Sequence, residues 1–306
     1  MKLKLSALTL LPLIAVLTAC ESVPQNNTRH KEKTNPMVVL PVATAVQIDY
    51  QDEVKLLRLN QLIAEHKGDS KQKALLFYER GIIYDRMGLS AHSRYDFTQS
   101  INADPAFPDA YNSLGIYLLL GQSYDEAFDA FDAAIELNGK MQYSYLHRAV
   151  GLYQVKRYPL ASRDINTFYE MDKSDPYRTL WRYIIDSKID PEKALITLQE
   201  EQSTGSDNRY VWSLIDVIAG RTSEKAFFET IGNGVETNKE IAQRLCEAYF
   251  YLGHFHKLSG NLDKAIYYFK LTTTTNIHEF IEYKYALMEL ASIQKELQEQ
   301  ALKTVN

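Results

Sequence analysis

The chain has 306 residues, of which 45% are hydrophobic and 24% charged, and its formal net charge is −5. This composition is typical of a folded globular protein with one large domain or two small ones. Nonspecific binding to nucleic acid needs an excess of lysine and arginine, so an acidic chain argues against that class of function.

The first 19 residues predict a secretory signal peptide. Lys2 and Lys4 supply positive charge, and the apolar run from Leu5 to Leu17 is too short for a membrane-spanning anchor. The run ends in "LTAC", which resembles the bacterial lipobox, where cleavage leaves Cys20 as a lipid-carrying N-terminus. The alternative is an ordinary signal peptide that contains a cysteine. Triacylation of Cys20 would give a lasting anchor, since each buried methylene contributes ~0.8 kcal/mol.

The residue after Cys20 predicts in which of the two membranes the protein is anchored. It is Glu21 and not the aspartate that retains lipoproteins in the inner membrane, so resemblance to that sorting rule implies the outer membrane, with the domain facing the periplasm. Removing residues 1–19 and their two lysines changes the formal charge from −5 to −7. Cys246 is then the only other cysteine, and we expect it to be a buried small apolar residue.

Residues 20–50 are predicted to be a tether, because they are polar, contain three prolines and show no helical period. The stretch "VVLPVATAV", residues 38–46, is an apolar exception within it. It is expected to dock either on the fold of its own chain or on a second subunit.

From residue 51 onward helical periodicity dominates, and three segments repeat at a spacing of 34 residues: 74–107, 108–141 and 142–175. Their fourth positions are aromatic, their eighth and twentieth positions are small, and their twenty-fourth positions are large and apolar. These sets are Phe77, Tyr111 and Tyr145; Gly81, Gly115 and Ala149; Ser93, Ala127 and Ala161; and Phe97, Phe131 and Ile165.

A fourth copy, residues 246–279, places Tyr249, Gly253, Ala265 and Phe269 at the same positions. The pattern resembles the tetratricopeptide repeat (TPR), a helix–turn–helix unit, so we expect an all-α solenoid. The small residues are expected where the two helices of a unit approach most closely. Residues 176–245 are predicted to be divergent repeats, and residues 280–300 an amphipathic helix that caps the last unit.

No catalytic pattern stands out. The phosphate-binding, dinucleotide-binding and nucleophile-elbow motifs are absent from the sequence. His254 and His256 are two residues apart, about 200° around a helix, so they do not face one metal ion together. We therefore expect a protein that is not an enzyme and that binds no cofactor or metal.

The first helices of TPR units line a groove that can hold a partner peptide or helix. Here the groove positions are apolar and rich in tyrosine, and they lack the Lys and Asn arrangement that clamps a C-terminal carboxylate. The alternative is that the tether, the C-terminal helix or a second subunit covers them. The candidate partner-binding residues are Tyr78, Ile82, Asn112, Ile116, Leu119, Tyr143, Leu146, Val150 and Tyr153, flanked by Leu75, Asp85 and Asp109.

The whole arrangement resembles the NlpI lipoprotein family of Gram-negative bacteria. The resemblance is carried by "LLFYERGIIYDRMGLSAHSRYDF", "PDAYNSLGIYLLL", "DPYRTLW" and "IHEFIEYKYALMEL", and covers the chain from about residue 53. It implies an outer-membrane-anchored homodimeric adaptor. Such an adaptor binds peptidoglycan endopeptidases, other murein hydrolases and a periplasmic C-terminal-processing protease, and thereby controls hydrolase turnover.

Two other classes remain open. One is a TPR lipoprotein that assembles a pilus secretin or inserts outer-membrane proteins, although the gap between the third and fourth repeats favours the adaptor. The other is an enzyme, which turnover by the purified protein would reveal. For a homodimer, residues 37–48 and the helix beginning near Asp52 are the expected interface.

Overall fold

The structure is a computed structural model that describes residues 40–201 and 210–305. The predicted signal peptide, the predicted lipidation site Cys20 and residues 20–39 of the predicted tether lie outside the described residues.

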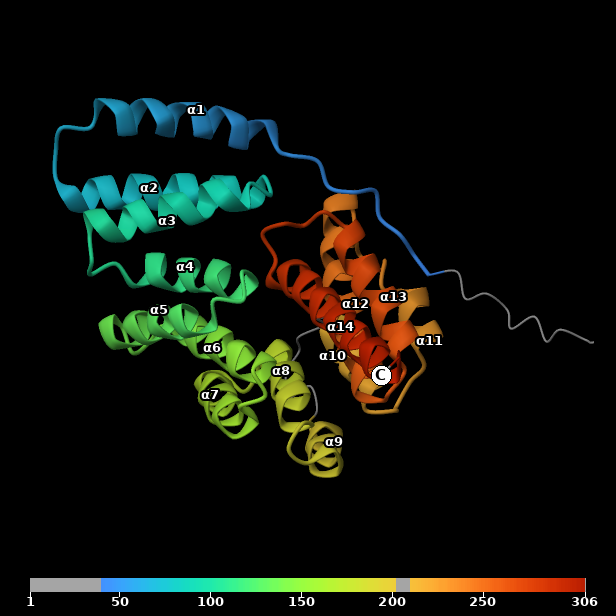
Figure 1. Ribbon diagram of the computed structural model, residues 1–306. Coiled ribbons are helices and arrows are strands. Elements are labelled where there is room, and N and C mark those ends of the chain that lie inside the picture. The colour runs from blue at the N-terminus through green and yellow to red at the C-terminus, as the bar shows by residue number, and fades with distance from the viewer. Residues whose placement is uncertain (1–39, 202–209, 306) are drawn as a thin grey trace, which may run out of the picture. The chain divides into compact units, whose positions relative to one another are not determined.

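The described residues form fourteen helices and no strand, which confirms the all-α prediction (Figure 1). In chain order the helices are α1 (Tyr50–Glu65), α2 (Ser70–Arg86), α3 (Ser90–Ala103), α4 (Pro108–Leu120), α5 (Tyr124–Leu137), α6 (Gln142–Gln154), α7 (Tyr158–Met171), α8 (Pro176–Asp186), α9 (Pro191–Glu200), α10 (Tyr210–Ile218), α11 (Glu224–Thr230), α12 (Asn238–Leu258), α13 (Leu262–Thr274) and α14 (Ile281–Val305). None of these helices is both long enough and apolar enough to cross a membrane.

The packed pairs α2–α3, α4–α5 and α6–α7 occupy the segments of the first three repeats, and α12–α13 forms a fourth such pair. α12 begins at Asn238, eight residues before the repeat pattern does, and so extends further than the other first helices. α8 starts at Pro176, which is 34 residues after the start of α6. The divergent region therefore continues the spacing of the repeats while losing their side-chain pattern.

The same turn joins the helices of each clear repeat. The fifteenth position has a positive φ in all four units: 73° at Gly88, 59° at Gln122, 62° at Lys156 and 77° at Gly260. In each turn the following N–H bonds to the carbonyl five residues earlier, as between Ser123 and Leu118 at 3.0 Å. This is the Schellman ending of a helix, in which glycine is preferred because it has no Cβ.

Side-chain caps start many of the other helices. Asp175 accepts a hydrogen bond of 3.0 Å from the N–H of Tyr177 at the start of α8. Asp190 does the same for Lys193 at the start of α9. A carboxylate at this position satisfies an N–H that has no partner within the helix.

The described part of the tether docks on its own chain. Thr44 and Asn238 exchange hydrogen bonds of 2.9 and 2.8 Å, and the N–H of Val46 donates to the carbonyl of Thr275 at 3.1 Å. Tyr249 donates its hydroxyl to the carbonyl of Pro41. The sequence predicted that residues 38–46 dock either on their own chain or on a second subunit. For residues 40–46 the structure shows docking on their own chain.

Candidate partner-binding surface

The C-terminal helix α14 lies against the first helices of the repeats. Lys284 donates to Asp85 of α2 at 3.0 Å, and the hydroxyl of Tyr285 lies 2.8 Å from Nδ1 of His147 in α6. α14 also packs against α4, α12 and α13, and the ring of Trp181 in α8 stands edge-on to that of Tyr285. We call the surface of α2, α4, α6 and α8 that faces α14 the inner face. The sequence predicted only that this helix caps the last unit.

A buried charge network holds α14 in place. Glu289 is fully buried and accepts hydrogen bonds from Lys257 at 2.5 Å and from Gln154 at 2.7 Å. Burial raises the pKa of the Glu289 carboxyl, but Lys257 and the neighbouring His254 outweigh it and lower that pKa. Burial lowers the pKa of His254 to about 4, so the imidazole is neutral at physiological pH.

Four of the predicted groove residues are covered by the chain itself. Leu119, Leu146, Val150 and Tyr153 are at most 6% exposed, and they pack in the main hydrophobic core with residues of α12 and α14. The sequence left open whether the chain or a partner covers the groove, and for these four residues it is the chain. These four side chains are therefore closed to a partner in this conformation.

The other five predicted residues remain partly accessible. Tyr143 is 49% exposed, while Tyr78, Ile82, Asn112 and Ile116 are half-buried. Asn112 accepts a hydrogen bond from Ser144 at 2.9 Å, and the ring of Tyr78 contacts those of Phe97 and Phe107. Of the flanking positions, Leu75 is exposed, Asp109 is half-buried and Asp85 is bound to Lys284.

Beside Tyr143 the inner face is hollowed by a cavity of about 270 Å³, here called the inner pocket. It lies between α6, α8, α12 and the start of α14. Six aromatic side chains line it: Tyr143, Phe168, Tyr177, Trp181, Tyr251 and Phe280. Four carboxylates also line it: Asp175, Glu247, Glu279 and Glu282. None of the described residues that line it is a lysine or an arginine.

Two of these carboxylates, Glu247 and Glu282, are buried close enough to repel each other. Burial and then the charge of Glu282 raise the pKa of Glu247 to about 8, and burial raises the pKa of Glu282 as well. Tyrosine hydroxyls act as their donors, Tyr210 to Glu247 and Tyr251 to Glu282, the latter at 3.2 Å. His147, which also lines the pocket, adds no positive charge, since burial lowers its pKa to about 3.

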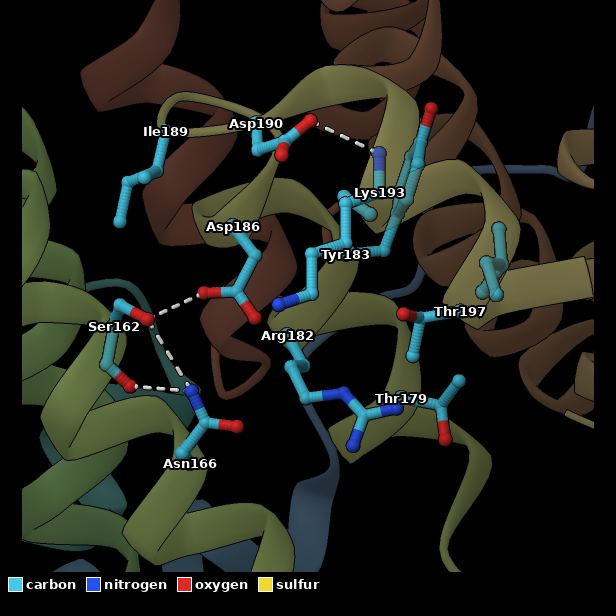
Figure 2. Close-up of a pocket in the computed structure, with 12 residues that line it drawn as sticks. Ser162, Asn166, Thr179, Arg182, Tyr183, Asp186, Ile189, Asp190, Lys193 and Thr197 are labelled. Carbon is cyan, nitrogen blue, oxygen red and sulfur yellow. Dashed lines mark hydrogen bonds between the residues drawn. The ribbon is translucent and has the colours of Figure 1, made fainter. Parts of the chain in front are cut away.

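A second, polar cavity of about 430 Å³ lies between α7, α8 and α9, and we call it the outer cleft. Figure 2 shows Ser162 and Asn166 on one side, with Arg182, Asp186 and Thr197 across from them. Ser162 donates to Asp186 at 2.6 Å, and Arg182 pairs with Glu201 at 2.7 Å. The Thr179 hydroxyl is buried here without a hydrogen-bond partner among the described residues. No sequence prediction pointed to this cleft.

The residues considered for chemistry lie apart. Cys246 is fully buried, as predicted, and burial raises the pKa of its thiol. The ring of His254 packs among aromatic side chains that include Trp181 and Phe269, while Nε2 of His256 lies 2.6 Å from Glu224. In the described part of the chain, no three His, Cys, Asp or Glu side chains are grouped so that they could hold a metal ion.

No protein-family model matches the chain. Among solved structures it is similar to the first TPR of Spaghetti (RPAP3) bound to the HSP90 peptide SRMEEVD, at 19% identity and a TM-score of 0.38, over 40% of this chain and 98% of that one. It is also similar to YrrB, described as a TPR protein with an unusual peptide-binding site, at 13% identity and a TM-score of 0.41, over 70% and 90%. A third match is the APC/C hetero-tetramer Cut9–Hcn1, at 18% and 0.46, over 77% and 40%. At these values the likeness says nothing about the partners of this chain.

Proposed function

We propose that this protein is an outer-membrane-anchored TPR adaptor, a homodimer that binds peptidoglycan endopeptidases and other murein hydrolases together with a periplasmic C-terminal-processing protease. By bringing a hydrolase to the protease, it controls hydrolase turnover and cell-wall growth. The helix-pair scaffold supports a protein-binding role in general. The particular partners, the dimer and the membrane follow from the family resemblance and the lipobox.

The observation that carries the adaptor role is that α8 contributes to two cavities. Tyr177 and Trp181, one helical turn apart, line the inner pocket, whereas Thr179, Arg182 and Asp186 line the outer cleft. Two residues along a helix correspond to about 200° of rotation, so Tyr177 and Thr179 point to opposite sides. A rigid element with a cavity on each side suits a protein that holds two partners at once.

The inner pocket has the features of a protein-binding anchor site. Aromatic side chains dominate it, and the helices that carry them are fixed by the buried contacts of α14. Binding energy at protein interfaces concentrates in such aromatic pockets. Half-exposed Tyr143 offers an incoming partner a large ring at small entropic cost.

The lipid anchor defines the reach of the adaptor. Cys20 lies 20 residues before the first described residue, Leu40. A chain of that length spans at most about 70 Å when fully extended. The proposal therefore places the binding surfaces close enough to the outer membrane to meet enzymes of the cell wall.

The test is a crosslinking pull-down of the lipidated protein from its own membranes, combined with a measurement of endopeptidase half-life in a deletion strain. The proposal expects an endopeptidase and a processing protease among the captured proteins, and a longer half-life without this protein. Unchanged half-lives would contradict it. Capture of a secretin or a β-barrel protein, with lost pili or barrels in the deletion strain, would support the assembly-factor class instead.

A further inference from the structure

We propose that the inner pocket takes the cationic side chain of a lysine or arginine from an extended segment of a partner protein. The proposal rests on the proposed function, because it assumes that the inner face binds a partner. It adds the chemistry by which that partner is recognised.

The first argument is the aromatic lining. The face of an aromatic ring attracts a cation within about 6 Å of its centroid, and more strongly where water is excluded. The pocket combines the buried rings of Trp181 and Tyr251 with half-exposed Tyr143. One ring of the lining, that of Phe168, already makes a cation–π contact, since the guanidinium carbon of Arg178 lies 4.1 Å from its centroid.

The second argument is the charge of the lining. Glu247 and Glu282 lie within the pocket lining, and the donors that the structure gives them are tyrosine hydroxyls and not cations. Burial beside another carboxylate raises the pKa of Glu247 to about 8. A cation brought between the two carboxylates would favour their ionised forms, since opposite charge offsets both repulsion and lost hydration.

The third argument is that the basic side chains nearby form their hydrogen bonds and ion pairs with groups other than Glu247 and Glu282. Lys284 donates to Asp85 at 3.0 Å. Arg178 donates to the carbonyl of Phe168 and to Gln142, both at 2.5 Å, and it also pairs with Asp175 of the pocket lining at 3.5 Å. Lys239 lies 3.9 Å from Glu279, which also lines the pocket. Among the described residues no lysine or arginine forms a hydrogen bond or ion pair with Glu247 or Glu282, so a cation from outside can lie between these two carboxyl groups.

The fourth argument is size. Pockets for whole small molecules are about 300–1,000 Å³. The inner pocket, at about 270 Å³, lies at the lower end of this range and has room for one long side chain. An extended peptide across the half-exposed residues Tyr78, Ile82 and Asn112 could place one residue in the pocket and leave its neighbours outside.

The experiment starts from a library of random 12-residue peptides, displayed on phage and selected on the lipidated full-length protein in detergent. A selected peptide is then synthesised with a fluorescent label, and again with its lysine replaced by Nε-acetyl-lysine. Binding is measured by fluorescence polarisation to the wild type and to Glu247→Gln, Glu247→Gln/Glu282→Gln and Tyr143→Ala. The matched control, Glu229→Gln/Glu296→Gln, removes two exposed charges outside the pocket.

We expect enrichment of Lys or Arg, at least tenfold weaker binding of the acetylated peptide, and at least tenfold weaker binding to the double pocket variant. The control should stay within twofold of the wild type, and thermal unfolding should show that each variant is folded. The acetylated peptide tests the same point on the unchanged protein, so a variant that does not fold leaves the test intact.

Outcomes that overturn the proposal are distinct from those that overturn the proposed function. Selected peptides without basic residues, or equal binding of the acetylated form, overturn the cation pocket alone. Peptides whose binding is unaffected by Tyr143→Ala also overturn it, because they bind elsewhere. If no peptide is selected, the cation pocket falls, whereas the proposed function falls only if endopeptidase half-lives are unchanged in the deletion strain.

Discussion

The backbone of Gly115 in α4 lies directly against the ring of Phe131 in α5. A Cβ at Gly115 would stand 2.5 Å from Cε1 of that ring, a distance that real Cβ atoms do not reach. The same contact recurs between Gly81 and Phe97, where the distance would be 2.7 Å. In the third repeat the pair is Ala149 and Ile165, both fully buried, so a larger residue in one helix goes with a smaller one in the other.

Gly115→Ala is therefore expected to destabilise the fold, although alanine favours a helix over glycine by about 1 kcal/mol. Phe131 is fully buried and has little room to move, and overpacking of this kind costs about 1–3 kcal/mol. Denaturant unfolding measures the change. Gly139→Ala is the control, because a Cβ there meets nothing closer than 4.0 Å, and its effect should be neutral or stabilising.

The double variant Gly115→Ala/Phe131→Ile copies the third repeat. It should lose less stability than the sum of the two single variants, because the smaller side chain makes room for the new methyl group. Additive losses would show that ring contact is not what keeps position 115 small.

The ion pair of Arg148 and Asp164 gives a second prediction. Arg148 donates to this buried carboxylate through Nε at 2.6 Å and Nη2 at 2.8 Å. Arg80 and Asp96 form the same pair at the same positions of the first repeat. Arg148→Leu leaves Asp164 buried without its partner, which should cost about 3–5 kcal/mol in the free energy of unfolding.

The second repeat supplies the control for that prediction. At the positions of Arg148 and Asp164 it has Leu114 and Ala130. Arg148→Leu/Asp164→Ala should therefore recover most of the stability that the single variant loses, since no buried charge remains. A double variant as unstable as the single one would mean that the ion pair itself, and not the orphaned carboxylate, matters.

Titration of His254 should make the free energy of unfolding depend on pH. Its pKa is about 4 in the fold and 6.5 in the unfolded chain, so between these values only the unfolded chain takes up the proton. Stability is therefore lost as pH falls from about 6.5 toward 4. Between pH 7 and pH 5 the loss from this residue is about 2 kcal/mol.

The measurement compares unfolding of the wild type and of His254→Phe at both pH values. Phenylalanine has no proton to gain, and its ring suits the aromatic surroundings of His254. The wild type should lose about 2 kcal/mol more than the variant over this range. Parallel pH curves would contradict a neutral, buried His254.

Docking of α14 should depend on Glu289. Glu289→Ala removes the acceptor of both Lys257 and Gln154, and breaking a buried pair costs about 3–5 kcal/mol. Hydrogen exchange should then show faster exchange across α14, and at buried groove residues such as Leu146. Glu296→Ala, an exposed change on the same helix, should leave exchange unchanged. Equal protection in both variants would mean that apolar contacts alone hold the helix.

Much of the helix-pair scaffold could be predicted because it is periodic. A spacing of 34 residues with fixed small and aromatic positions reports contacts within a unit, and these are local in sequence. The position of α14 has no such signal. Within it Glu289 is 1% exposed and Leu287 is 47% exposed, the reverse of what an amphipathic pattern suggests.

Only part of the inner pocket could be predicted, because the repeat pattern reports local contacts and not contacts between distant segments. Tyr143 and Leu146 follow from the groove positions of the third repeat, whereas Glu247, Tyr251 and Phe280 come from more than 100 residues further along the chain. Which distant segments meet is decided by tertiary packing. The outer cleft is local in sequence, with a lining that runs from Ser162 to Leu198, but the divergent region lacks the side-chain pattern that would have pointed to it.

The most direct test of the adaptor account is site-specific photo-crosslinking from the inner face in native membranes. A photoreactive phenylalanine replaces Tyr143, and in a matched control it replaces Tyr267, which is similarly exposed on α13. The account predicts that position 143, and not position 267, captures a peptidoglycan endopeptidase or a C-terminal-processing protease. Adducts at position 143 that contain only a secretin or a β-barrel protein, or the same adducts at both positions, would contradict it.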